Sequence, residues 1–483
     1  MTEKVLDVLI VGAGLAGISA AVRLKRALPH CDFLLSESRE VTGGTWDLFR
    51  YPGVRSDTDM YTLGYRTRPW QDTRRMLDGP SILRYLRETV NEQGLADRIV
   101  FGERVVATDW SSETQCWTVT LRRNADGAHF TRRARFLHLC TGYYHYDYGY
   151  RPSFEGEQAY RGRLIHPQQW PEDIDYAGQR IVVIGSGATA MTLVPALAQR
   201  AAHVTLLQRS PTYVATQPLH DPLARFLEPW MPRALAYRLV RWKCIVVGQS
   251  LYAFARWQPS RVRRRILDMA KAALPLGYDV EKHFAPRYQP WDERICAVAD
   301  DDLFRKIRQG RVSMVTDTIR RFVPEGIETD SGQILLADVI VTATGLRVLP
   351  LGGIEISIDG RRVSLPETMV YRGAMLSGVP NLVTTFGYTN ASWTLRAELI
   401  STYVCRLLAY LERHGFKSAI ADRDPSVGER PFLDFTSGYV KRALPGLPKQ
   451  GDRFPWRVHQ NYLKDFLVTY FKPLRDGTLR FQR

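Results

Sequence analysis

Cysteine is scarce in this 483-residue chain, and its spacing argues against several classes of protein. No two of the six cysteines form a Cys-x-x-Cys pair. They stand singly, at Cys31, Cys116, Cys140, Cys244, Cys296 and Cys405. A disulfide framework, a zinc ribbon and a dithiol reductase centre are therefore disfavoured, and we expect no metal site. The expected location is a reducing compartment, the cytoplasm.

Long apolar runs are also lacking. No stretch reaches the roughly 18 apolar residues that a membrane-spanning helix needs, and the run over 244–255 is interrupted by Gly248, Gln249 and Ser250. The apolar stretch over 8–22 carries regularly spaced glycines and lacks the basic flank of a signal peptide. We expect a soluble protein, or one that lies peripherally at the inner face of the cell membrane.

Acidic residues are outnumbered, because 66 Lys and Arg stand against 50 Asp and Glu, for a net charge of +16. Such an excess indicates nucleic acid, an anionic membrane surface or an anionic cofactor as a partner. No helix-turn-helix, zinc-finger or RNA-binding signature accompanies the charge, so we expect no nucleic acid. The apolar content of 45% disfavours disorder, and the length suits about two to four domains.

A dinucleotide-binding crossover is predicted at the start of the chain. Residues 5–11 form an almost continuously apolar run that is typical of a buried parallel strand. The run enters the turn Gly12-Ala-Gly14-Leu-Ala-Gly17, and a helical pattern follows. Gly12 permits the tight turn, Gly14 lets the backbone approach a pyrophosphate, and Gly17 lets the helix pack on the strand. The next predicted strand ends in Glu37, whose carboxylate is placed to bond ribose hydroxyls.

The same pattern recurs after residue 179. A β-branched strand enters Gly185-Ser-Gly187-Ala-Thr-Ala190, which is a Gly-x-Gly-x-x-Ala turn, before another helical stretch. The strand that follows ends in Arg209 and Ser210 instead of an acid. A cation at this place suits the 2′-phosphate of NADPH, which a carboxylate would repel. We therefore expect FAD in the first site and NADPH in the second.

Two short strands end in Thr-Gly pairs, at Gly142 and Gly345. Because glycine adds no Cβ, such strand ends let the backbone pass close to a cofactor. We interpret them as the places where the chain leaves the first unit and returns to it. The predicted fold is α/β, with two Rossmann-like dinucleotide-binding domains, the NADPH domain inserted in the FAD domain, and a helical insert. The predicted ranges are 1–145 and 346–483 for the FAD domain, 146–213 and 292–345 for the NADPH domain, and 214–291 for the helical insert.

Two longer motifs resemble those of the class B flavin monooxygenases. Residues 160–171, Tyr-Arg-Gly-Arg-Leu-Ile-His-Pro-Gln-Gln-Trp-Pro, resemble the Baeyer–Villiger fingerprint FxGxxxHxxxWP, with Tyr160 in place of Phe. The matching positions are Gly162, His166 and Trp170. Residues 43–57, from Gly-Gly-Thr-Trp to Val-Arg-Ser-Asp, match a second pattern of the family. We expect His166 to couple domain movement to NADPH binding, and Trp170 and Trp46 to serve packing.

The resemblance spans the whole chain and implies an activity. It implies an FAD- and NADPH-dependent Baeyer–Villiger monooxygenase that inserts one oxygen atom of O2 next to a ketone carbonyl, giving an ester or lactone. The oxygen would pass through a peroxide at the flavin C4a position, which also oxidises soft sulfur, so sulfides and thioamides are implied as further substrates. Further cofactor contacts that the resemblance implies are Gly44, Thr45, Trp46, Asp47 and Asn390.

The resemblance also implies a catalytic pair. Arg294, in Pro-Trp-Asp-Glu-Arg-Ile-Cys, falls where the family has its active-site arginine, and Asp57 falls where it has a carboxylate that steers that arginine. A guanidinium suits this place because it keeps its proton beside an anionic peroxide and stabilises a developing oxyanion. Glu293 stands where many ketone-oxygenating relatives carry Lys, which leaves Arg209 as the cation expected at the 2′-phosphate.

Two alternatives stay open at the level of the sequence. One is a flavin monooxygenase used chiefly for S- or N-oxygenation, and the other is a basic nucleotide-binding or surface-binding protein without turnover. Oligomeric state and substrate size are also left open, because pocket residues come from distant segments.

The expected helical insert carries half of the excess charge. Between Asp221 and Pro275, eleven cations face three acids, for a net +8, and Trp230, Trp242 and Trp257 are interleaved with them. We expect helices without strands here, forming a lid or ordinary packing. Peripheral contact with an anionic membrane is the alternative.

Overall fold

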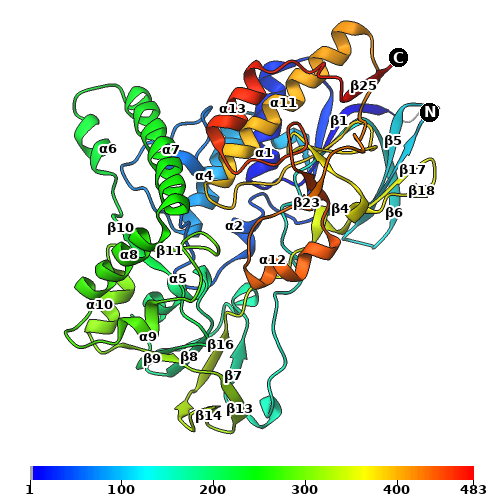
Figure 1. The fold of residues 1–483 in the computed structure, drawn as a ribbon. Coiled ribbons are helices and arrows are strands. Elements are labelled where there is room, and N and C mark those ends of the chain that lie inside the picture. Colours follow the sequence, from blue (N-terminus) through cyan, green and yellow to red (C-terminus); the bar gives the residue numbers. More distant parts are fainter. Residues whose placement is uncertain (1–3) are drawn as a thin grey trace.

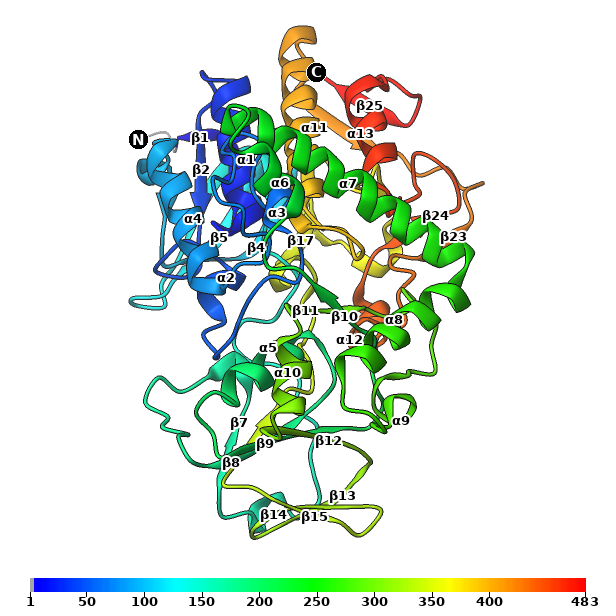
Figure 2. The same ribbon diagram turned by 90° about the vertical axis from the view of Figure 1, so that its left-hand side faces the viewer.

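The protein folds around two sheets, in a computed structural model that describes residues 4–483. The larger sheet lies in one half of the molecule and the smaller sheet in the other (Figure 1; Figure 2). The first three residues of the predicted range 1–145 lie outside the described part. The α/β class predicted from the sequence is confirmed.

The larger sheet has 11 strands in the order β18-β17-β4-β5-β6-β1-β2-β3, with β21 also paired to β6 and leading to β20 and β19. Its parallel centre consists of β21, β6, β1, β2 and β3. The strands from the first part of the chain are β1 (Val5–Val11), β2 (Phe33–Ser36), β3 (Ile99–Val100), β4 (Glu103–Ser111), β5 (Cys116–Arg123) and β6 (His129–Leu139). Those from the last part are β17 (Glu355–Ile358), β18 (Arg361–Arg362), β19 (Val370–Tyr371), β20 (Met375–Leu376) and β21 (Leu382–Thr384).

Strand β1 is apolar on both faces because both faces are covered. It pairs in parallel with β2 on one side and β6 on the other, and Val8, Leu9 and Ile10 are fully buried. Helices α1 (Leu15–Ala27), α4 (Gly79–Glu92) and α11 (Trp393–His414) cover one face, and α13 (Tyr462–Phe471) packs on α11. The other face packs against Trp110, Trp117 and Phe432. Helix α1 packs on α11, so the C-terminal part of the chain closes the unit that the N-terminal part begins.

The smaller sheet is entirely parallel, in the order β12-β9-β8-β16-β7. Its strands are β7 (Arg163–Ile165), β8 (Arg180–Ile184), β9 (His203–Gln208), β12 (Val312–Thr316) and β16 (Val339–Thr342). Helices α5 (Ala188–Leu197) and α10 (Asp302–Arg308) pack on it, and β13 (Ile319–Val323), β14 (Gly326–Thr329) and β15 (Ile334–Leu336) form a separate sheet beside it. All of these strands fall between β6 and β17 in the chain. The predicted insertion of one Rossmann-like unit in the other is therefore confirmed, whereas the residue boundaries of the domains stay a prediction.

The two crossings between the units run side by side. Tyr144 and Val348 form an antiparallel bridge, His145 N–H donates to the Arg347 carbonyl (2.8 Å), and Tyr150 N–H donates to the Gly345 carbonyl (3.0 Å). The two connections, residues 144–150 and 345–348, are therefore hydrogen-bonded to each other, and we call this pair the strap.

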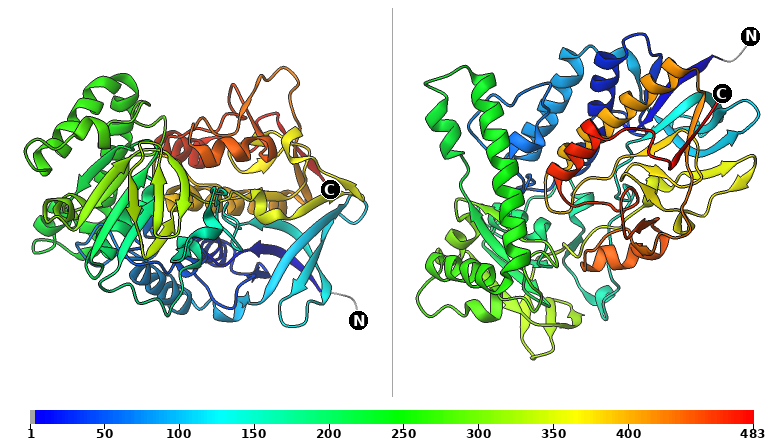
Figure 3. Two further views of the ribbon diagram at one scale, coloured as in Figure 1. Left: turned by 90° about the horizontal axis from the view of Figure 1, so that it is seen from below. Right: turned by 45° about the horizontal axis from the view of Figure 1, so that its top comes forward.

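The segment expected as a helical insert is not helical throughout. Its first residues form β10 (Val214–Gln217), which pairs in parallel with β11 (Cys296–Ala299) just after the insert. The expectation of helices without strands was therefore wrong at this end, because a four-residue strand gives too short a pattern to detect. The helices that follow are α6 (Pro222–Leu227), α7 (Arg233–Trp257), α8 (Pro259–Ala273) and α9 (Val280–Phe284). Helix α7 extends along the outside of the molecule (Figure 3).

The remaining elements are short. They are α2 (Thr45–Leu48), α3 (Met60–Leu63), α12 (Gly438–Ala443), β22 (Ser418–Ala421), β23 (Glu429–Pro431), β24 (Lys449–Gly451) and β25 (Leu479–Gln482).

A buried histidine at the end of β6 makes the stability of the fold sensitive to acid. His138 lies 2.8 Å from the Thr385 hydroxyl, and burial lowers its pKa to about 3. Between pH 6.5 and that value the unfolded chain binds a proton that the folded chain does not. We therefore expect this residue to lower the free energy of unfolding by up to about 1.4 kcal/mol for each pH unit of acidification in that window.

Denaturant unfolding at pH 7 and pH 5 tests this expectation with His138→Gln. The variant should lose less stability on acidification than the wild type. The same substitution at exposed His129 should leave the pH dependence unchanged. An unchanged pH dependence in His138→Gln would show that His138 is not responsible.

Candidate active site

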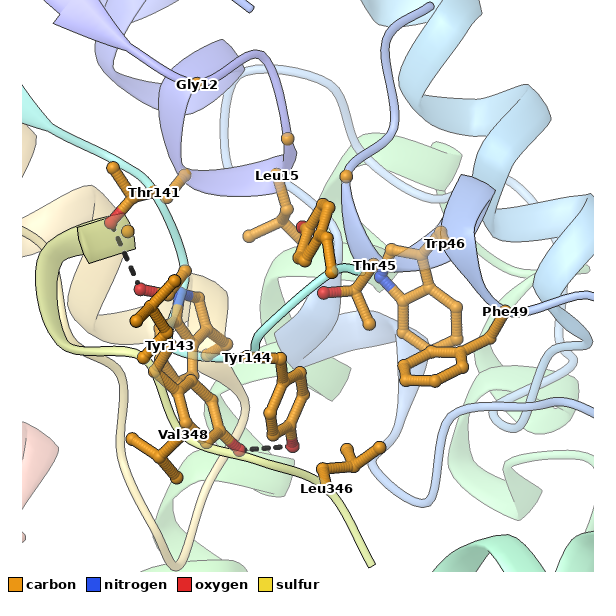
Figure 4. A pocket seen from close by; sticks show the side chains of 18 of the residues that line it. Gly12, Leu15, Thr45, Trp46, Phe49, Thr141, Tyr143, Tyr144, Leu346 and Val348 are labelled. Carbon is orange, nitrogen blue, oxygen red and sulfur yellow. Dashed lines mark hydrogen bonds between the residues drawn. The ribbon is translucent and has the colours of Figure 1, made fainter. Parts of the chain in front are cut away.

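A cavity of about 580 Å³ lies where the two units meet. Its lining includes the turn after β1, the start of α5, the strap between the units, and Arg294 with Asp57. In Figure 4, Trp46 and Phe49 lie on one side of this cavity, and Tyr143, Tyr144 and Val348 lie on the other. Segments from both units and from the strap therefore share one cavity.

The first glycine turn has the geometry that a bound pyrophosphate needs. Gly12 has a φ of +104°, and a Cβ there would lie 2.6 Å from the Cys140 carbonyl oxygen. A Cβ on Gly17 would lie 1.8 Å from the Gly12 oxygen, so α1 can pack on β1 only with glycine at this place. Gly14 and Gly44 line the cavity and face each other, since a Cβ on Gly44 would lie 3.1 Å from the Gly14 Cα. Gly14 caps α1 without a side-chain hydrogen bond. The free N–H groups at the start of α1 suit an anion.

Glu37 directly follows β2, as predicted, and its side chain reaches the glycine turn. Its carboxylate accepts hydrogen bonds from the Ala13 N–H (2.6 Å) and the Arg39 N–H (2.9 Å), and it lines the cavity. Burial raises the pKa of Glu37, and these backbone bonds oppose that rise by favouring the anion. The remaining lone pairs can accept from ribose hydroxyls.

The second glycine turn opens toward the same cavity. Gly185 has a φ of +129°, and a Cβ there would lie 2.3 Å from the Ala343 carbonyl oxygen. A Cβ on Gly187 would meet nothing within 4 Å, and Gly187 caps α5 without a side-chain hydrogen bond. Ala188 and Thr189, in the first turn of α5, line the cavity. Open space in front of a helix start is what an approaching phosphate requires.

Arg209 and Ser210 lie at the carboxyl end of β9, next to the end of β8 where this turn begins. Both are exposed. Arg209 makes no ion pair with any carboxylate in residues 4–483, so its guanidinium is free to bind an anion. Ala190 is buried in the helix and supports its packing.

Arg294 and Asp57, which are far apart in the chain, form a two-point ion pair. Arg294 Nη2 lies 3.1 Å from Asp57 Oδ1, and Arg294 Nε lies 3.0 Å from Asp57 Oδ2. The Asp57 carboxylate raises the pKa of Arg294, which keeps the guanidinium charged. Because Arg294 lines the cavity, 40% of its side chain stays accessible there. The pair therefore presents a fixed cation to the cavity.

Asp57 is held by a segment that touches both units. A Cβ on Gly53 would lie 2.4 Å from the Thr192 carbonyl oxygen in α5, so the loop packs tightly on that helix. Arg55 pairs with Asp302 in α10 at 2.5 Å. The position of Asp57, and through it that of Arg294, thus depends on how the two units are docked.

An aromatic wall beside Arg294 was missed by the sequence analysis. Tyr143 stacks on Trp393 with ring centroids 5.0 Å apart, and Phe386 lies 5.3 Å from both rings. The Tyr143 and Tyr144 hydroxyls are hydrogen-bonded to each other (Figure 4). Both tyrosines directly follow Gly142, which lines the cavity. Their position after the Thr-Gly pair could therefore have predicted that they lie at the site. Phe386 and Tyr439, which also line the cavity, had no such signal.

The fingerprint residues lie outside the cavity, and His166 contacts the strap. His166 Nε2 lies 3.3 Å from the Gly345 carbonyl, and its Nδ1 accepts from the Gln168 N–H (3.2 Å). Burial lowers the pKa of His166, and these contacts fit a neutral ring that donates to Gly345. Gly162 lets Tyr160 pass close, and the Tyr160 hydroxyl donates to the Ala337 carbonyl (3.1 Å). Trp170 packs edge-on against Tyr176.

Some implied cofactor residues lie on the cavity and others do not. Thr45 and Trp46 line it, whereas Asp47 is buried in an ion-pair cluster with Arg39 and two further arginines. Asn390 donates to the Gln460 carbonyl (2.9 Å), and its Oδ1 is buried without a partner. The structure therefore brings Thr45 and Trp46 to the site and gives Asp47 a structural environment.

No group of three or more potential metal ligands occurs among residues 4–483. No helix within the same residues is long and apolar enough to span a membrane. Two glycine turns that lead into helix starts, with the half-buried Arg294 at the same cavity, are typical of an enzyme that binds two nucleotides.

Comparison with known proteins identifies the family. The chain is 51% identical to the FAD-containing monooxygenase EthA of Mycobacterium tuberculosis over 485 residues, which cover 100% of this chain and 99% of that protein. It is 44% identical to the probable FAD-binding monooxygenase AlmA of Acinetobacter baylyi, over 100% of this chain and 97% of that protein. The flavin-binding monooxygenase-like family matches residues 63–223, and the NAD(P)-binding Rossmann-like domain matches residues 10–79. The chain belongs to the family of FAD-containing monooxygenases and is an oxidoreductase.

Solved structures with lower sequence identity share the fold. An oxidised steroid monooxygenase bound to NADP superposes with a TM-score of 0.77 at 21% identity, over 99% of this chain and 100% of that chain. OTEMO in complex with FAD and NADP superposes with a TM-score of 0.72 at 22% identity, over 87% and 88% of the two chains.

Proposed function

We propose that this enzyme is an FAD- and NADPH-dependent Baeyer–Villiger monooxygenase that converts a ketone to an ester or lactone, and that it also oxygenates sulfides or thioamides. The observation that carries the proposal is the shared cavity. Two uncapped helix starts and the Arg294–Asp57 pair all face it. A nicotinamide that reduces a flavin must meet it in one such space.

The residues present fit both cofactors. Gly12, Gly14 and Gly44 leave backbone where a pyrophosphate would approach, and Glu37 would hold the ribose of FAD. The open space at Gly187, and Arg209, which has no carboxylate partner in residues 4–483, would hold the phosphates of NADPH. Bound FAD, reduced by NADPH, would activate O2, of which one oxygen atom enters the product and the other leaves as water.

Arg294 would act on the negative charge that develops at the substrate carbonyl. A guanidinium that stays protonated can stabilise this oxygen without donating its proton to an anionic oxidant. Asp57 would act as a positioning residue, because it holds two atoms of the guanidinium in one orientation. The aromatic wall of Tyr143, Phe386 and Trp393 offers an apolar surface for the carbon substituents of the ketone.

Product analysis tests the proposal. The purified holoenzyme is given NADPH and O2 with a methyl ketone in one reaction and a thioether in another. We expect an ester from the ketone and a sulfoxide from the thioether. Sulfoxide without ester would replace the proposal with S-oxygenation, and an absence of NADPH oxidation would favour a nucleotide-binding protein without turnover.

A further inference from the structure

A second cavity, of about 470 Å³, lies beneath α7, between that helix and α1, α11 and α13. It is separate from the site described above, because the two cavities share no lining residue. Figure 2 shows α7 crossing the outside of the unit that contains α1 and α11.

The lining of this cavity is strongly cationic. Four arginines that make no ion pair with a carboxylate in residues 4–483 converge on it. They are Arg23 and Arg26 from α1, Arg66 from the loop after α3, and Arg238 from α7. Arg23 Nε is buried without a hydrogen-bond partner. Arginines that form no ion pair with an acid in residues 4–483, one of them with a buried Nε that has no partner, indicate a place for an anion.

The acidic residue in the lining, Glu398, already interacts with Arg241 and the Arg66 backbone. Glu398 bonds Arg241 Nη2 at 2.6 Å and the Arg66 N–H at 2.7 Å. Arg241 also donates to the Tyr61 and Gly64 carbonyls, and these contacts hold α7 against α3 and the residue that follows it. Arg26 and Arg66 have only neutral side-chain partners, Gln93 and Tyr470, so Glu398 forms no ion pair with the four arginines among residues 4–483.

An exposed apolar surface borders this cavity, which we define as the apolar face. Trp242 lines the cavity, is 43% exposed and contacts Phe466 of α13 with ring centroids 5.9 Å apart. Trp230, before α7, is 78% exposed, and Phe471, at the end of α13, is 72% exposed. The other members are Phe226, Leu235, Leu239, Val246 and Leu467. The spacing of Leu235, Leu239, Trp242 and Val246 places them on one face of α7, and an exposed apolar face of this kind marks a site of interaction.

We propose that the arginine cavity binds the phosphate of an anionic membrane lipid, while the apolar face enters the headgroup region of the same membrane. Charge complementarity favours this occupant. The region from Asp221 to Pro275 carries a net +8, which attracts an anionic surface. A second copy of the chain would bring +8 against +8 across a twofold interface. Tryptophans beside arginines are also typical of segments that lie at a membrane surface.

Vesicle flotation of the holoenzyme tests the proposal. Vesicles of phosphatidylcholine alone are compared with vesicles that also contain phosphatidylglycerol, at low and high salt. We expect binding to the mixed vesicles, and weaker binding as salt rises. Arg23→Gln combined with Arg238→Gln should weaken that binding about 25-fold, from roughly fivefold for each charge. Retained flavin absorbance and NADPH oxidation show that the variant is folded.

A charge-matched control separates the cavity from diffuse attraction. Arg135→Gln with Arg361→Gln removes two exposed cations from the larger sheet, and we expect less than about a twofold change. Equal losses in both double variants would overturn the assignment to the cavity.

Two further measurements address other occupants. Trp230→Ser with Phe471→Ser should reduce vesicle binding and leave the mass in light scattering unchanged. A fall from dimer to monomer would instead assign the apolar face to a second copy. Titration of the wild type with inorganic phosphate tests whether the anion is a free phosphate ion. Phosphate binding without vesicle binding would overturn the proposal that the anion is a lipid headgroup.

Discussion

Replacement of Arg294 by Ala is expected to abolish oxygenation while NADPH still reduces the flavin. The guanidinium lies at the cavity and is held by Asp57 through two contacts of 3.1 and 3.0 Å. Removing one preorganised donor from an oxyanion site typically lowers the rate by about 10²–10³-fold. In the proposed reaction Arg294 is also the fixed cation of the site, so the loss of ester should lie at the upper end of that range.

Stopped-flow absorbance gives the rate of flavin reduction, and chromatography gives the amount of ester. The reduction rate of Arg294→Ala should stay within about tenfold of the wild type, since nothing in this step needs the oxyanion contact. Arg256→Ala is a suitable control, because Arg256 is paired with Asp292 at 2.6 Å and does not line the cavity. Normal ester formation by Arg294→Ala would remove Arg294 from the mechanism.

Asp57→Asn separates positioning from chemistry. The amide keeps one acceptor for Arg294 but loses the charge that fixes the guanidinium at two atoms. We expect a smaller loss of ester than in Arg294→Ala, with flavin reduction again retained.

Replacement of Arg209 by Ala is expected to weaken NADPH binding far more than NADH binding. The side chain is exposed at the end of β9 and has no carboxylate partner in the described residues, so it is available to the 2′-phosphate. A hydrogen bond to a charged group contributes about 1.5–3 kcal/mol, which corresponds to a rise of roughly 10–150-fold in the KM for NADPH. NADH lacks the 2′-phosphate, so its KM should change less than about threefold.

Steady-state NADPH and NADH oxidation, measured side by side, checks this expectation. Arg320→Ala removes another exposed arginine of the same unit and should leave both KM values unchanged. Equal changes in the two KM values of Arg209→Ala would mean that Arg209 does not read the 2′-phosphate.

Local features were predictable because their cause is local. The strand 5–11, the turn at Gly12 and the acid Glu37 follow from periodicity and from the positive φ that the turn requires, and the structure has them in this order. The second turn at Gly185 is of the same kind. Strand β10 was missed, because four residues carry too little pattern to set them apart from the helices that follow.

Asp47 and Asn390 show where transfer from a family motif is weakest. Asp47 lies in the motif that matches the family, yet its carboxylate is engaged by Arg39 and two other arginines. Asn390 lies beside two residues that line the cavity but does not line it itself. A motif fixes the backbone course more firmly than it fixes which side chain reaches the ligand.

The sequence by itself determined the two nucleotide-binding turns, their order and the excess of positive charge, because each depends on neighbouring residues or on composition. Only the tertiary structure decided that Arg294 meets Asp57 and that the two crossings pair into one strap with Tyr143 and Tyr144 on the cavity. It also decided that four arginines without a carboxylate partner among residues 4–483 gather beneath α7. These are contacts between segments far apart in the chain. They depend on how the sheets and helices dock, which no local pattern encodes.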